Sequence, residues 1–131
     1  MARLDTVNLG QPRPNPHKEV GRTGIGKQPT EGPVEVRAPG PKETGLGSGL
    51  VGDFIGDGKH HGGDGQAVYA FQREDLDEWE RRLGRELPNG FFGENLAMHR
   101  GQPGRAWTAG EMLMSWRRSG SHRDNLGRVE F

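Results

Sequence analysis

Short runs of alternating apolar and polar residues predict β-strands in this sequence. Residues 4–9 and 34–36 alternate in this way. Residues 67–71 form the clearest predicted strand, because β-branched and aromatic side chains favour extended backbone. Between the runs the chain is dense in glycine and proline, which favour turns, and Gly52-Asp53 is expected to be a turn or a bulge.

One amphipathic helix is predicted over residues 73–83. Its apolar residues Leu76, Trp79 and Leu83 have the spacing of a single helix face. Acidic residues fall in the first turn and basic residues in the last, which suits the helix dipole. Gly84 follows at the position of a left-handed cap. Short strands, frequent turns and one helix together predict a mainly β fold, a small barrel-like domain.

Composition then excludes several classes of function. The 131 residues carry 18 basic and 18 acidic groups, so no overall charge favours a nucleic-acid surface. No apolar run approaches the length of a membrane span, and the first residues lack the apolar stretch of a secretory signal. We therefore expect a cytoplasmic protein with no nucleic-acid or membrane partner. Without any cysteine, the chain offers no disulfide, thiolate metal ligand or cysteine nucleophile.

Two glycine patterns imitate nucleotide-binding loops. Residues 21–28 nearly fit the phosphate loop, but Gln28 stands where that loop needs a hydroxyl group, and prolines follow where a helix should begin. Residues 47–52 match GxGxxG, but no βαβ unit surrounds them. Both are better explained as glycine-rich turns. A weaker hypothesis retains three residues of the first pattern as contacts to an anionic ligand: Arg22, Thr23 and Lys27.

The densest group of polar residues is the 59–66 loop, which runs directly into the 67–71 strand. Its glycines would let backbone N–H groups approach an anion, and its lysine and histidines add charge or donors. Adjacent histidines point apart and no further ligand follows at helical spacing, so zinc is not expected. Residues 91–96 place two aromatics before Gly-Glu-Asn and could wall a pocket. From residue types alone, a surface turn and a core anchor remain open alternatives for these two segments.

Together these segments resemble the MOSC domain, the molybdenum cofactor sulfurase C-terminal domain. They are similar to its stand-alone bacterial branch, which includes 6-hydroxylaminopurine reductase. The resemblance lies in residues 21–27, 49–53, 59–69 and 89–96, and it covers residues 4–96 in order. It implies a β-barrel that binds molybdenum cofactor, a pterin dithiolene with a phosphate or nucleotide tail. The cofactor-binding residues implied by the resemblance are Lys59, His60, His61, Gly62, Gly63, Asp64, Gln66, Glu94 and Asn95.

The resemblance also implies a reaction and partners. Family members reduce small N-hydroxylated substrates at the metal, with electrons supplied by a separate redox protein. Some members are instead linked to sulfur transfer and to partners that use pyridoxal phosphate. For this chain the alternatives to a reductase are a non-catalytic cofactor carrier and an inactive remnant.

The family's expected molybdenum ligand has no counterpart in this sequence. The family places a cysteine in a Pro-Arg-x-Pro-Cys-like stretch near its C-terminal end, and soft metals favour sulfur. Residues 97–131 contain no such stretch, and the resemblance ends at Leu96. We therefore expect a MOSC-like domain over residues 1–96 and a divergent, truncated or out-of-frame tail over residues 97–131. The barrel would then be incomplete and catalysis impaired. Reading the gene in its other two frames beyond codon 96 tests the frameshift.

Overall fold

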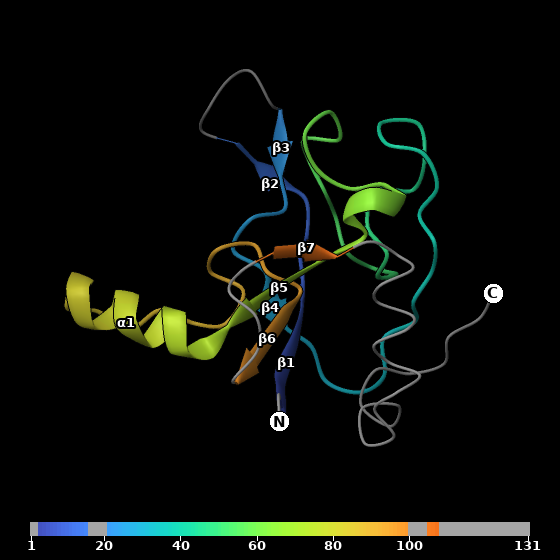
Figure 1. Ribbon diagram of the computed structural model, residues 1–131. Helices are drawn as coiled ribbons and strands as arrows, with labels where there is room; N and C mark the ends of the chain where they lie inside the picture. The colour runs from blue at the N-terminus through green and yellow to red at the C-terminus, as the bar shows by residue number, and fades with distance from the viewer. Residues whose placement is uncertain (1–2, 16–20, 100–104, 108–131) are drawn as a thin grey trace.

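The computed structural model describes residues 3–15, 21–99 and 105–107, and its main feature is a five-stranded sheet (Figure 1). The strand order is β4-β1-β6-β5-β7, and a two-stranded sheet of β2 and β3 lies beside it. The β5–β6 pair is parallel, and the other neighbouring pairs are antiparallel. The strands are β1 (Arg3–Leu9), β2 (Arg13–Pro14), β3 (Arg22–Thr23), β4 (Gln28–Pro29), β5 (Val68–Gln72), β6 (Leu96–His99) and β7 (Arg105–Trp107).

Two short helical elements complete the described structure. The 3₁₀ turn η1 (Asp64–Gln66) precedes β5, and helix α1 (Arg73–Leu83) connects β5 to its parallel neighbour β6. Parallel strands need such a crossover connection. Among the described residues, no helix has the length and apolar character needed to cross a bilayer. The mainly β fold with one helix is confirmed, and the described part of the sheet is open rather than closed into a barrel.

The core lies where β1, β5 and β6 meet the loop segments that cover them. Its buried members are apolar residues drawn from all parts of the described chain: Val7, Val34, Val36, Leu50, Val68, Ala70 and Leu96. The predicted strand at 4–9 corresponds to β1, and the predicted strand at 67–71 is shifted by one residue in β5.

The predicted strand at 34–36 is wrong. Val34 and Val36 are buried as the alternation suggests, but the only ladder contact in this segment is an isolated bridge between Val36 and Leu50. Pro33 and Pro39 flank the segment, and proline supplies no backbone N–H for a sheet ladder. The alternation therefore reports burial here without a continuous strand.

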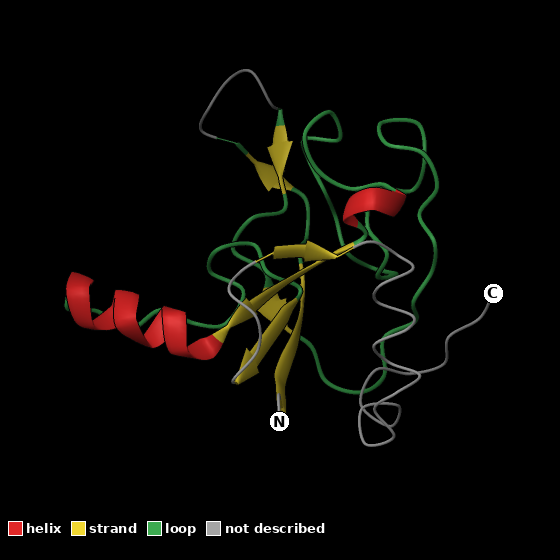
Figure 2. Cartoon of the chain, viewed as in Figure 1, coloured by secondary structure: helices red, strands yellow, loops and turns green. Residues whose placement is uncertain are grey.

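Helix α1 matches its predicted bounds, and Gly84 caps it in the left-handed conformation with φ of 65°. The prediction of one buried apolar face is only partly correct. Leu76 is fully buried, but Trp79 and Leu83 are 44% and 54% exposed. Figure 2 shows that the helix begins at the end of β5 and extends away from the sheet, and within the described residues the Trp79 ring packs edge-on against Phe92 with the ring centroids 6.4 Å apart.

Candidate ligand-binding cleft

Residues from separate parts of the chain line a cleft with a volume of about 440 Å³. The lining comes from residues 15, 22–25, 27, 54–57, 61, 62, 66, 69, 92, 93 and 95. A volume of this size is in the range of pockets that hold small molecules. The polar side chains on its wall include Arg22, Thr23, Asp57, His61, Gln66 and Asn95, and the apolar ones are Ile25, Phe54, Ile55, Tyr69 and Phe92.

One wall of the cleft requires a glycine for close chain packing. A Cβ at Gly24 would lie only 2.0 Å from the backbone oxygen of Phe54. The absence of a side chain therefore lets the β3 segment lie directly against the 54–57 segment. The Arg22 guanidinium carbon lies 5.2 Å from the centre of the Phe54 ring, a cation–π geometry that holds a positive charge at this wall.

A buried ion pair lies at this wall, and its lysine, Lys27, is part of the cleft lining. Lys27 Nζ is 2.5 Å from Asp53 Oδ1, and the side chains are 7% and 0% exposed. The same carboxylate accepts the Gly10 N–H at 2.7 Å and, through Oδ2, the Asn95 Nδ2 at 2.9 Å. Buried charges need such partners because burial removes their hydration. Asp53 therefore neutralises Lys27, and this lysine is a structural cation rather than a free charge for a ligand.

Asn95 joins this buried pair to the sheet. Its Oδ1 accepts the Tyr69 N–H at 3.1 Å, and its Nδ2 donates to Asn8 O at 3.2 Å as well as to Asp53. Both side-chain N–H groups are thus engaged within the protein. Asn95 lines the floor of the cleft and offers a ligand only acceptor capacity.

Glu94 shapes the neighbouring turn from the interior. Its side chain is fully buried, Oε1 accepts the Gly90 N–H at 2.5 Å and Oε2 accepts the Phe92 N–H at 3.1 Å. Burial raises the pKa of Glu94 above its usual value, although the hydrogen bonds from the Gly90 and Phe92 N–H groups act in the opposite direction. The carboxylate organises the turn that brings Phe92 and Gly93 to the cleft, and it is not itself part of the lining.

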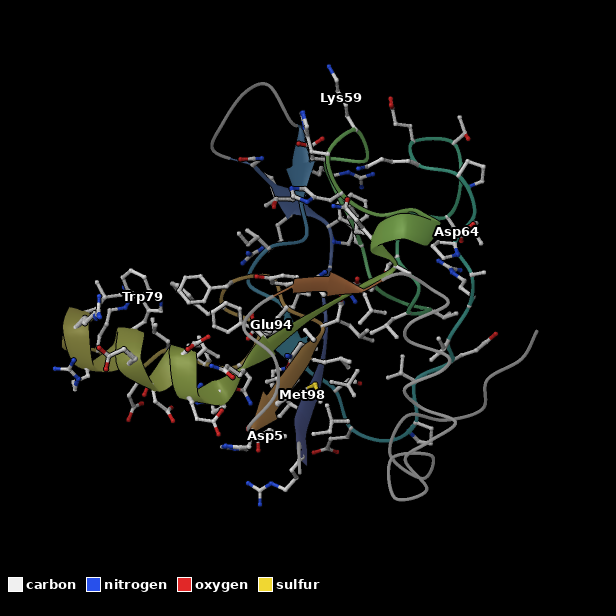
Figure 3. The ribbon with its side chains drawn as sticks, viewed as in Figure 1. Asp5, Lys59, Asp64, Trp79, Glu94 and Met98 are labelled. Atoms are coloured by element: carbon white, nitrogen blue, oxygen red, sulfur yellow. The ribbon has the colours of Figure 1, made fainter. Side chains whose placement is uncertain are left out.

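The predicted binding loop divides between the cleft and the outer surface. His61, Gly62 and Gln66 lie on the cleft wall. Lys59 points away from the body of the molecule (Figure 3). His60 bonds to Asp57 at 2.8 Å, and this hydrogen bond lowers the pKa of Asp57. Of the nine predicted residues, the structure brings His61, Gly62, Gln66 and Asn95 together on the lining, and places Lys59, His60, Gly63, Asp64 and Glu94 outside it.

The two glycines of this loop are required by contacts within the chain. Gly62 and Gly63 have φ of 86° and 77°, in the left-handed region. A Cβ at Gly62 would lie 2.9 Å from Gly47 O, and one at Gly63 would lie 2.9 Å from the Lys42 backbone. Loop packing therefore accounts for both glycines, and their predicted contact with a ligand stays a prediction.

Several lining residues had no signal in the sequence. Phe54 and Ile55 lie outside the segments of the MOSC resemblance, and only the fold brings them to the same lining as His61. Arg22, Thr23 and Lys27, the three residues of the weaker anion hypothesis, all line the cleft, although the Lys27 charge is paired with Asp53. A residue's place in this cleft depends on contacts between distant segments, which local patterns do not report.

Comparison with known families adds an independent observation. The MOSC domain matches residues 57–122, which is half of the chain. The chain belongs to the MOSC domain family. The match spans β5, α1, β6 and β7, and it continues beyond Leu96 into the segment predicted to be a divergent tail. The division of the chain at Leu96 stays a prediction.

A curated relative of this MOSC chain is the "Uncharacterized protein YflK" of Bacillus subtilis (strain 168). It is 33% identical over 95 residues, which cover 71% of this chain and 38% of the relative. The chain thus spans well under half the length of the curated relative that it matches. No solved structure matches it significantly. The MOSC family is linked to molybdenum cofactor binding, so the cleft can be tested against that group.

The MOSC cleft suits the organic part of the cofactor better than its metal. On the wall, Arg22, Thr23, His61 and Gln66 offer positive charge and hydrogen-bond donors to an anionic tail, and Asp57 contributes one carboxylate. In contrast, no three His, Asp or Glu side chains among the described residues converge as a metal site. The 131 residues also contain no cysteine. The residues present fit the tail, and they supply no thiolate for the molybdenum.

Proposed function

We propose that this chain binds the molybdenum cofactor through the cofactor's anionic tail. The observation that supports this proposal is the convergence of the Arg22 segment and the His61–Gln66 segment on one cleft. Both segments belong to the MOSC resemblance, and they are separated by more than 30 residues in the sequence. Their meeting places positive charge and hydrogen-bond donors around a volume suited to a small molecule.

Three polar wall residues have a defined capacity for the tail. Arg22 carries a permanent charge and a planar set of donors, which suit phosphate oxygens. Thr23 Oγ1 accepts the Ile25 N–H at 3.1 Å, so its hydroxyl hydrogen is available to donate. His61 lies on the same wall and adds a ring N–H donor. Tyr69 and Phe92 supply aromatic surface for a planar pterin ring.

We further propose that binding in this chain is not matched by efficient catalysis. When bound, the cofactor supplies two-electron redox chemistry at molybdenum. Reduction of an N-hydroxylated compound consumes two electrons and two protons and releases the hydroxyl oxygen as water, with electrons from a separate redox protein. These 131 residues hold no thiolate for the metal, which is the ligand type that soft metals favour. A cofactor-binding module is therefore favoured over a reductase.

Equilibrium binding tests the first proposal. Molybdenum cofactor freshly released from a molybdoenzyme is titrated into the protein at fixed ionic strength. Arg22→Ala and His61→Ala should each weaken binding by roughly tenfold, because each removes a charged or donor group from the wall. Lys59→Ala is the matched control in the same loop and should leave the affinity unchanged. Unaltered affinity in the Arg22→Ala/His61→Ala double variant would contradict tail binding at this cleft.

Turnover tests the second proposal. The loaded protein is supplied with an N-hydroxylated purine and an artificial electron donor, and formation of the amine is followed. We expect a rate close to that of free cofactor. Turnover well above that rate would establish a reductase and overturn the carrier interpretation.

A further inference from the structure

A loop of residues 39–47 packs against η1 and the glycine that precedes it. Asp64 ties the two together, since its backbone N–H donates to Gly40 O at 2.9 Å and its Oδ1 accepts the Gly40 N–H at 2.9 Å. The Gly63 N–H donates to Gly47 O at 2.9 Å. These three hydrogen bonds hold the 39–47 loop in a defined position beside the cleft wall.

The same packing fixes the backbone of Lys42. A Cβ on Gly63 would lie 2.9 Å from both the N and Cα of Lys42, so the two backbones are in contact. The loop is closed on itself by the Leu46 N–H, which donates to Pro39 O at 2.7 Å. Glu43, next to Lys42, has φ of 66°, a left-handed conformation that is uncommon for residues other than glycine. The starting point of the Lys42 side chain is therefore determined by the fold.

From this position Lys42 holds one end of the Gln66 amide. Lys42 Nζ donates to Gln66 Oε1 at 3.0 Å. An ammonium group has donors and no acceptor, so the amide atom that faces Lys42 has to be the oxygen. Gln66 lines the cleft and Lys42 does not. With its oxygen held by Lys42, the amide has its NH₂ group left for the cleft.

We propose that Lys42 is a positioning residue that makes Gln66 a hydrogen-bond donor to the ligand. The inference rests on the proposed function, in which that ligand carries phosphate oxygens. Without Lys42 the amide could turn and present its oxygen, which would repel a phosphate. Lys42 would thus set the preference of this wall for acceptor-rich ligands without touching them.

Nuclear magnetic resonance of the ligand-free protein tests the orientation directly. In the wild type, the Gln66 Nε2 protons should show Overhauser contacts to cleft residues such as His61. Lys42→Glu replaces a donor with an acceptor, so the amide should turn and its Nε2 protons should contact the new Glu side chain. Lys42→Arg retains a donor and should preserve the wild-type contacts. Identical contacts in wild type and Lys42→Glu would overturn the inference.

Calorimetric binding of inorganic pyrophosphate tests the consequence. Lys42→Glu should weaken binding about tenfold more than Lys59→Glu, which makes the same charge change on an exposed lysine outside the lining. When each lysine substitution is made in the Gln66→Ala variant, the two proteins should bind pyrophosphate with equal affinity, because no amide remains to be turned. A difference that persists without Gln66 would show a general charge effect and overturn the inference.

The two readouts separate failure of the inference from failure of the proposed function. If wild-type protein does not bind pyrophosphate but the amide turns as expected, tail binding is overturned and the positioning role of Lys42 is supported. If pyrophosphate binds in an Arg22-dependent manner but the amide does not turn, the positioning role is overturned and tail binding is supported.

Discussion

Asp53 shows how one carboxylate holds distant parts of this chain together. It accepts hydrogen bonds from Gly10, Lys27 and Asn95, which belong to three different segments. The sequence marked it only as part of a turn. Its buried charge is compensated by a single cation, so each partner depends on the other.

Asp53→Asn should destabilise the protein by about 3–5 kcal/mol, because it leaves the Lys27 ammonium buried without a counter-charge. Unfolding in urea measures the change. Asp57→Asn is the control, since Asp57 is only partly buried and its partner His60 is exposed, so loss of this pair should change stability less. Equal effects of the two substitutions would contradict the structural role assigned to the buried pair.

The buried Glu94 side chain should make the free energy of unfolding depend on pH. Its pKa is raised in the folded protein, chiefly by burial, so the folded state binds a proton more tightly than the unfolded chain does. Its contribution to stability is therefore fully present below pH 4.5 and is lost as the pH rises from 4.5 through the folded-state pKa.

Glu94→Gln should remove this pH dependence. Its loss of stability relative to the wild type, about 1–3 kcal/mol because one of the two buried N–H donors loses its acceptor, should be largest near pH 4 and shrink as the pH rises. The free energy of unfolding is measured for both proteins across pH 4 to 8. If the difference between them is constant over this range, the raised pKa of Glu94 is contradicted.

In helix α1, the bounds and the burial have different causes. Its bounds follow from local sequence, since the capping glycine and the charge distribution act within one or two turns. How much of it is buried depends on where the sheet ends. Leu76 packs into the protein, and the Arg82 guanidinium lies 5.8 Å from the Trp79 ring on the exposed part of the helix.

The two ends of the apolar face should therefore respond differently to truncation. Leu76→Ala should cost about 2–5 kcal/mol, as expected for a buried leucine. Trp79→Ala should cost less than Leu76→Ala, because Trp79 is 44% exposed and the main ring contact that it loses is the edge-on contact with Phe92. Both are compared by urea unfolding. A larger loss from Trp79→Ala would mean that the later turns of α1 are covered in solution.

At the scale of the whole molecule, the strands and the cleft share one buried polar centre. The Asn8 N–H donates to Asn95 O at 2.7 Å, and the Asn95 N–H donates to Tyr69 O at 2.8 Å. These bonds connect β1 and β5 to the residue that forms the cleft floor. Opening the cleft floor therefore requires disruption of the sheet.

Hydrogen exchange should reflect this organisation. The amides of Asn8, Tyr69 and Asn95 should exchange only through global unfolding, and those of α1 beyond Trp79 should exchange through local fraying. Exchange rates measured by nuclear magnetic resonance give the comparison. Faster exchange at Asn95 than at Arg82 would contradict a rigid cleft floor.

The sequence by itself determined the elements whose causes are local. Strands β1 and β5, the bounds of α1 and the Gly84 cap follow from residue preferences over a few positions. The mainly β fold follows from the same preferences. The MOSC resemblance was also present in the sequence, chiefly in the His-Gly-Gly segment at residues 61–63 and the Gly-Glu-Asn-Leu segment at residues 93–96.

Only the tertiary structure decided what the motif residues contact. Asn95 bonds to Asn8 across 87 positions and to Asp53 across 42, and no local pattern reports such pairs. The same holds for Lys59, which the fold turns away from the cleft, and for Arg22, which it brings in. A side chain's partners are set by which segments pack together, and burial then forces each polar group to find one.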